Sequence, residues 1–226
     1  MAVAFDAVSS AFQTACPTPP CNTTVSWTHT PVGTPSLVVV ALSIGKDVGV
    51  TTATYGGTAL TLIREDVGIQ DGNTFLYRLI SPPTGAQTVS LTIDSDEDIE
   101  GAAVTVTGSD TTTPISNSAG ASGVDPTDPS VTVTSAAGEL VIDVIGGKIA
   151  FVFTAGADQT KRWEENQVGA GSTEAGAASV TMSWTVTTGV GDGWVISAVS
   201  IKPAAAAGGW GRLLGATRNR LIHVPR

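Results

Sequence analysis

Residues 180–186 read VTMSWTV and alternate strictly between apolar and polar side chains. Successive side chains of an extended strand point to opposite faces, so this stretch has one apolar face and one hydroxyl-bearing face. The apolar face holds Val180, Met182, Trp184 and Val186. The pattern predicts a half-buried β-strand whose apolar face packs on a core.

The same two-residue period recurs along most of the chain before residue 203. TVSWTH (24–29) places Trp27 and His29 on one face. Runs that are apolar on both faces predict central strands covered on both sides at 36–44, 139–146 and 194–201. Further strands, separated by turns rich in Gly, Pro, Asp and Ser, are predicted at 58–63, 74–80, 87–93, 101–108, 130–135 and 150–154.

Many short strands without amphipathic helical patterns predict an all-β fold, an antiparallel jelly-roll β-sandwich with a carboxyl-terminal extension. The chain has 226 residues, of which 42% are apolar and 14% charged. That size allows one sandwich domain with a single core, which we expect over residues 1–203. Residues 204–209, AAAAGG, are typical of a linker. No repeat at a fixed period is visible, which disfavours a propeller or a solenoid.

Charge is distributed unevenly along the chain. The formal net charge is −9, and residues 204–226 hold four arginines and no acidic residue, so residues 1–203 carry −13. A body this acidic repels phosphate backbones, so we expect no nucleic-acid partner. The amino terminus lacks the basic start and apolar stretch of a signal peptide, and no run approaches eighteen uninterrupted apolar residues. We therefore expect synthesis in a cytoplasm, without an export signal or a membrane span.

We predict that residues 210–226 form a docking arm. Their apolar side chains are too many for a solvated tether and too few for a core of their own. We expect the arm to bind another protein chain, as an added strand or a groove-bound helix, with its arginines facing an acidic neighbour. The alternative is a frayed terminus or an expression-vector residue. The predicted interface residues are Trp210, Arg212, Leu213, Leu214, Arg218, Arg220, Leu221, Ile222 and Arg226.

The segment DSDEDIE (94–100) is the densest cluster of charge. Asp94, Asp96 and Asp98 match the first, third and fifth positions of a calcium loop. However, Ile99 stands where that loop needs glycine and Thr105 where it needs glutamate, which excludes an EF-hand. The three aspartates are weak candidates for an irregular calcium site, and a solvated turn is the interpretation we favour.

No arrangement typical of catalysis stands out, so we predict a protein that is not an enzyme and needs no cofactor. Neither DSDEDIE nor RWEEN has the carboxylate spacing of a sandwich-type glycosidase. The histidines are His29 and His223, and His29 shares a strand face with Trp27. We expect His29 to be packed and hydrogen-bonded instead of acting as a general base.

More than one role is open for Trp163, and more than one bonding state for the two cysteines. Trp163, in TKRWEENQ, is flanked by charges and could be a platform for a sugar ring, an interface anchor or an indole lying over the sandwich edge; we favour the last two. Cys16 and Cys21 lie in CPTPPC and offer too few ligands for structural zinc. We favour a disulfide formed after release from the cell over two free thiols.

The succession of VSWTHTPVGTPSLVVVALS (25–43), FLYRLISPPTGAQTVSLTI (75–93), GELVIDVIG (138–146) and GWVISAVSIKP (193–203) resembles a jelly-roll, concanavalin-A-like module. Such modules occur in bacterial surface proteins and in tailed-phage virion proteins, and the resemblance covers roughly residues 3–203. It implies a structural or adhesive role, and the expected lack of a signal peptide favours the phage proteins.

From this resemblance we expect a structural virion protein, either a capsid decoration protein or a head or tail fibre component. Its partners would be other virion chains, such as capsid or copies of itself. A glycan-binding adhesin that contacts a host glycan is the second alternative, and a glycan-cleaving enzyme is the third.

Overall fold

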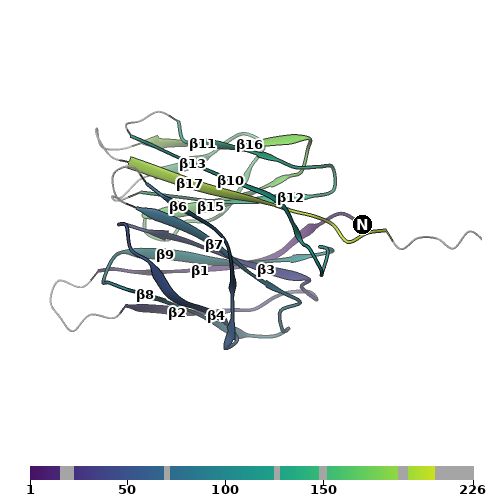
Figure 1. Cartoon of the computed structure of the whole chain (residues 1–226), viewed down its shortest axis with the longest axis horizontal. Coiled ribbons are helices and arrows are strands. Elements are labelled where there is room, and N and C mark those ends of the chain that lie inside the picture. Colours follow the sequence, from purple (N-terminus) through teal and green to yellow (C-terminus); the bar gives the residue numbers. More distant parts are fainter. Residues whose placement is uncertain (16–22, 69–71, 125–127, 148–151, 188–192, 207–226) are drawn as a thin grey trace, which may run out of the picture.

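The computed structural model of this chain describes residues 1–15, 23–68, 72–124, 128–147, 152–187 and 193–206 (Figure 1). Within these ranges the secondary structure is β-strand, with no helix. The first half contains β1 (Ala4–Gln13), β2 (Thr24–His29), β3 (Leu37–Ile44), β4 (Val50–Tyr55), β5 (Thr58–Ala59), β6 (Thr61–Val67), β7 (Asn73–Ile80), β8 (Gln87–Ile93) and β9 (Ile99–Thr107). The second half contains β10 (Ile115–Val124), β11 (Ser130–Thr134), β12 (Leu140–Gly147), β13 (Val152–Ala155), β14 (Thr160–Trp163), β15 (Gly169–Ala175), β16 (Ser179–Thr187) and β17 (Gly193–Ile201).

The strands form two sandwich units, and neighbouring strands pair antiparallel. In the first unit (residues 1–107) the sheet β1-β9-β3-β7-β6 faces the sheet β2-β8-β4-β5. In the second unit (residues 115–201) the sheet β10-β17-β12-β15-β14 faces the sheet β11-β16-β13. The predicted all-β antiparallel sandwich is therefore confirmed.

Three hydrophobic clusters replace the single core expected from the sequence. One lies between the two sheets of the first unit and one between the two sheets of the second. The third lies between the two five-stranded sheets, an interface that we call the seam. β3, β12 and β17 are buried along their whole length because each lies between two clusters, which explains their apolar character on both faces.

The two units repeat the same strand order. Phe5 and Leu37 both pair with Val106, just as Ile115 and Leu140 both pair with Ile201. The register shifts also fall at matching places, between Phe5 and Ala7 in β1, Ile115 and Asn117 in β10, Leu62 and Arg64 in β6, and Lys161 and Trp163 in β14. The chain thus contains an internal structural repeat of two units.

This repeat has no fixed period in the sequence, because the connections of the two units differ in length. Phe5 and its counterpart Ile115 are 110 residues apart, whereas Leu37 and Leu140 are 103 apart. Val106 and Ile201 are only 95 apart. A search for self-similarity at one period therefore misses the duplication.

The units pack across the seam with approximate twofold symmetry. β3 packs on β12 in the middle, β1 packs on β14 at one rim, and β6 packs on β10 at the other. Because β1 corresponds to β10 and β6 to β14, exchanging the units reproduces the same contacts. Figure 1 shows the two five-stranded sheets stacked between the smaller outer sheets.

Polar groups also cross the seam. Glu100 on β9 is fully buried and accepts backbone hydrogen bonds from the segment before β15 in the other unit. Ser43 Oγ donates to the carbonyl oxygen of Val168 over 2.9 Å, and the hydroxyls of Thr74 and Ser197 lie 2.8 Å apart. These bonds fix the register of one unit on the other. They act in addition to the apolar surface that is buried in the seam cluster.

Candidate functional site

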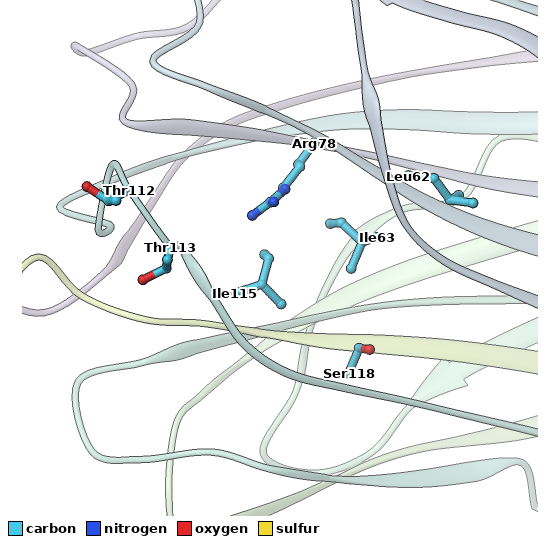
Figure 2. A pocket seen from close by; sticks show the side chains of 7 residues that line it. All are labelled: Leu62, Ile63, Arg78, Thr112, Thr113, Ile115 and Ser118. Atoms are coloured by element: carbon cyan, nitrogen blue, oxygen red, sulfur yellow. The ribbon is translucent and has the colours of Figure 1, made fainter.

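An open pocket of about 320 Å³ lies at the β6–β10 rim of the seam (Figure 2). The first unit contributes Leu62, Ile63 and Arg78 from β6 and β7. The connection into the second unit and β10 contribute Thr112, Thr113, Ile115 and Ser118. We call this site the rim pocket; Figure 2 shows Arg78 pointing into the space between these two groups of residues.

The threonine side of the rim pocket is held by Asp110. Its Oδ1 accepts hydrogen bonds from the backbone amides of Thr112 and Thr113, over 2.7 and 2.9 Å. Lys202 Nζ pairs with Asp110 Oδ2 at 3.3 Å and donates to Thr113 Oγ1 at 2.7 Å. The backbone amides of Thr113 and Thr112 lower the pKa of Asp110, so it stays ionised and keeps this turn in place.

Arg78 differs from the other cationic side chains of the described residues. Four of those side chains form ion pairs, namely Lys46–Glu97, Arg64–Asp66, Lys161–Glu164 and Lys202–Asp110. Arg162 lies 3.8 Å over the ring centre of Phe5. Within the described part of the chain Arg78 has no carboxylate, hydroxyl or aromatic partner, although its side chain is half-buried. Its guanidinium donors are therefore available to a ligand.

The lining of the rim pocket supports binding. A guanidinium, three hydroxyls and three aliphatic side chains meet there, and none of the seven residues is a carboxylate, histidine or cysteine. Such a lining can hold a small anion that has an apolar side and further polar groups. The lining offers no group for general acid or base work at neutral pH.

His29 is packed and hydrogen-bonded, as its strand pattern predicts. It is fully buried, with Ser9 Oγ 2.8 Å from Nδ1 and Thr105 Oγ1 3.2 Å from Nε2. Thr105 Oγ1 in turn donates to Asp6 Oδ2 over 2.8 Å. Burial lowers the pKa of His29, against an opposing effect of Asp6, so the imidazole is a neutral link between β1, β2 and β9.

The acidic side chains of DSDEDIE (94–100) have two roles: some accept backbone hydrogen bonds from nearby loops, and Glu100 is buried. Asp98 Oδ1 accepts from the amide of Ala15 at 2.7 Å, and Asp94 Oδ2 accepts from the amide of Gly49 at 3.3 Å. Glu100 lies in the core instead of the solvated cluster. Among the described residues no group of three or more His, Cys, Asp or Glu side chains is arranged for a metal ion. The weak calcium candidates Asp94, Asp96 and Asp98 are not brought together as such a group.

Trp163 is part of the core, which corrects the favoured expectation of an interface anchor on the surface and leaves no exposed indole face as a platform for a sugar ring. It is only 4% exposed and belongs to the seam cluster. Its indole lies directly over Gly171 on β15, where any side chain would clash with it. The flanking charges misled the sequence interpretation, because Lys161 and Glu165 are exposed and Arg162 lies half-buried over the Phe5 ring, whereas the indole between them turns into the seam.

Several predicted residues lie outside the described residues. Cys16 and Cys21 are among them, as are the whole predicted arm from Trp210 to Arg226 and His223 within it. In the described part of the chain no helix has the length and apolar character needed to cross a membrane.

The rim pocket was not anticipated from the sequence. Its one signal is Arg78, an isolated charge within TFLYRLI (74–80), a strand that is otherwise apolar. The threonines and Ser118 carry no comparable signal, because hydroxyl residues occur throughout this chain.

No protein family, curated protein or solved structure matches this chain. Its function is therefore inferred from its own residues and from the resemblance described above.

Proposed function

We propose that the protein is a structural virion protein, a capsid decoration protein or a head or tail fibre component. Residues 210–226 would anchor it to neighbouring chains, either capsid or copies of itself. The observation that carries the proposal is the opposite charge of the two parts: −13 in residues 1–203 against four arginines without an acidic residue after them. Opposite charges on body and arm favour binding of the arm to the body of a neighbour.

The described surface supports this arrangement. Among the described residues the body has few lysine and arginine side chains, and four of these form ion pairs with carboxylates of the same chain. Its excess of acidic groups is thus left to face solvent or the arginines of another chain. Eight or nine strands in two antiparallel sheets per unit also agree with the jelly-roll part of the proposal.

The described chain is held in place up to the first residue of the predicted linker. Beyond β17, Pro203 forms a β-bridge with Ser109, and the amide of Ala204 donates to the carbonyl oxygen of Gly108 over 2.8 Å. The chain is therefore tied to the connection between the two units at Pro203 and at the first residue of the linker, Ala204.

Deleting residues 204–226 is expected to abolish co-purification of the protein with virions, because the deletion removes the anchoring side chains. Replacing all four arm arginines by glutamine should leave partial association that is less sensitive to salt, since the apolar contacts remain. Virions purified from a lysate would be probed for full-length, truncated and substituted protein. Retention of the truncated protein at the full-length level would contradict the proposal.

A glycan-binding role is the second candidate, and the rim pocket favours it. The pocket combines a cation with hydroxyl groups, whereas Trp163, the residue first considered for this role, is buried. Neither proposal includes a catalytic step.

A further inference from the structure

The rim pocket exists because the two rims of the seam are filled differently. At the β1–β14 rim, the positions equivalent to Ile115 and Ser118 are held by Phe5 and Val8. Arg162 lies over the Phe5 ring at that rim. At the β6–β10 rim, Ile63 stands where the other unit has Arg162. Smaller side chains on the same backbone leave the space of about 320 Å³ open.

The two arginines near this rim, Arg64 and Arg78, do not close the pocket by packing into it. Arg64 turns to Asp66, with its Nε and Nη2 2.5 and 2.6 Å from the carboxylate oxygens, and so does not fill the pocket. Arg78 faces the pocket without a partner in the described chain. A half-buried guanidinium loses part of its hydration without gaining a hydrogen bond, which a bound anion would correct.

We infer that the rim pocket binds the carboxylate of an acidic sugar residue, with Arg78 as the carboxylate-binding group. A guanidinium offers two parallel N–H donors that match a carboxylate. A monoanion is favoured over a phosphate dianion because the body carries −13 and Asp110 lies beside the pocket.

The rest of the lining matches a hydroxylated ring. Because Lys202 Nζ donates to Thr113 Oγ1, the hydroxyl hydrogen of Thr113 is available for an acceptor on the ligand. Thr112 and Ser118 add hydroxyls that can both donate and accept. Leu62, Ile63 and Ile115 form an aliphatic wall for the C–H face of a sugar ring. The volume is at the lower end for ligand pockets, which suits one sugar residue.

This inference does not depend on the arm or on the virion proposal, because every residue of the rim pocket belongs to the described body. The full-length protein would be titrated with glucuronate, glucose, inorganic phosphate and a short peptide with a free α-carboxylate, followed by amide chemical shifts. We expect saturable binding of glucuronate with a dissociation constant of about 1 mM, as fits a ligand of this size. Shifts should concentrate at residues 112–118.

Two variants and one control test the assignment. Arg78→Gln should weaken glucuronate binding about tenfold or more, since the charge-assisted bonds are lost. Ile115→Phe copies the filled rim and should block binding while thermal unfolding shows an intact fold. Lys161→Gln removes one positive charge at the position equivalent to Leu62 and should bind glucuronate as the wild type does.

Four outcomes would overturn the inference. They are no glucuronate binding up to about ten times the expected dissociation constant, equal affinity for glucose, unchanged affinity in Arg78→Gln, and shifts located away from the pocket. Saturable binding of the peptide or of phosphate alone would identify a different ligand class and would likewise reject an acidic sugar.

Discussion

Replacing Glu100 by alanine is expected to lower the free energy of unfolding by about 3–5 kcal/mol, because each buried amide left without an acceptor costs about 1–3 kcal/mol. Glu100 is fully buried, and its two carboxylate oxygens accept hydrogen bonds from the backbone amides of Glu165, Asn166, Val168 and Gly169. Burial raises the pKa of Glu100, and the four amides oppose that rise. Alanine would leave all four amides without this acceptor, and those of Val168 and Gly169 are buried.

The measurement is urea unfolding followed by tryptophan fluorescence. Glu100→Gln should lie between the wild type and alanine, because one amide oxygen can still accept while the amide nitrogen faces donors. Glu65→Gln, an exposed carboxylate on β6, is the control and should change stability by less than about 0.5 kcal/mol. An alanine variant as stable as this control would show that the buried carboxylate does not hold the units together.

Asp143 is expected to make stability depend on pH between about 4 and 7. Burial raises the pKa of Asp143 to about 7, against the opposing hydrogen bonds of Ser172 and Trp184. Asp143 Oδ1 accepts from both the amide and the hydroxyl of Ser172 at 2.7 Å, and Oδ2 accepts from Trp184 Nε1 at 2.6 Å. It thereby links β12 to β15 beside it and to β16 in the facing sheet.

The direction in which stability changes with pH follows from the raised pKa of Asp143. The carboxyl binds its proton more tightly in the folded state, so its contribution is fully present below the unfolded pKa and is lost as the pH rises through the folded pKa. Relative to Asp143→Asn, the wild type should lose up to about 4 kcal/mol between pH 4 and pH 8, from about three pKa units at 1.36 kcal/mol each.

Unfolding free energies of the wild type and Asp143→Asn, measured at each pH, provide the test. Asp110→Asn is a control of opposite sign, because the pKa of Asp110 is lowered and its contribution is lost only as the pH falls. A constant difference between wild type and Asp143→Asn from pH 4 to pH 8 would mean that Asp143 does not titrate in this window.

The strands that sequence reasoning predicted are those with a strong apolar signal. The structure agrees closely at β3, β8, β12 and β17, and Met182 and Trp184 are buried as the alternation in VTMSWTV requires. The face of Val25 and His29 is likewise buried. In these segments hydrophobic burial alone decides which face turns inward.

Two of the strands that were missed, β10 and β15, are rich in glycine, alanine and serine. β10 reads ISNSAGASGV and β15 reads GAGSTEA. Their small residues let other side chains lie directly on the backbone, as Trp194 does over Gly123 and the Asp66 carboxylate does over Gly120. Such strands are fixed by what packs on them from elsewhere in the chain, so their own periodicity is weak.

The candidate site was missed for a related reason. The rim pocket is formed by Leu62, Ile63 and Arg78 of one unit and by four residues between Thr112 and Ser118, which come together only because two repeated units pack face to face. The second unit is not visible as a repeat in the sequence, so neither the seam nor its two rims could be predicted. The buried charges Glu100 and Asp143 were hidden in the same way, since their partners lie in other strands.

Joining two like units in one chain has a consequence for how such a contact can diverge. In a homodimer every substitution appears at both ends of the interface, so an opening that admits a ligand at one end weakens packing at the other. A tandem chain is free of that constraint. Here Phe5 and Trp163 can close one end while Arg78 lies at an opening on the other, and either end can change without altering its counterpart.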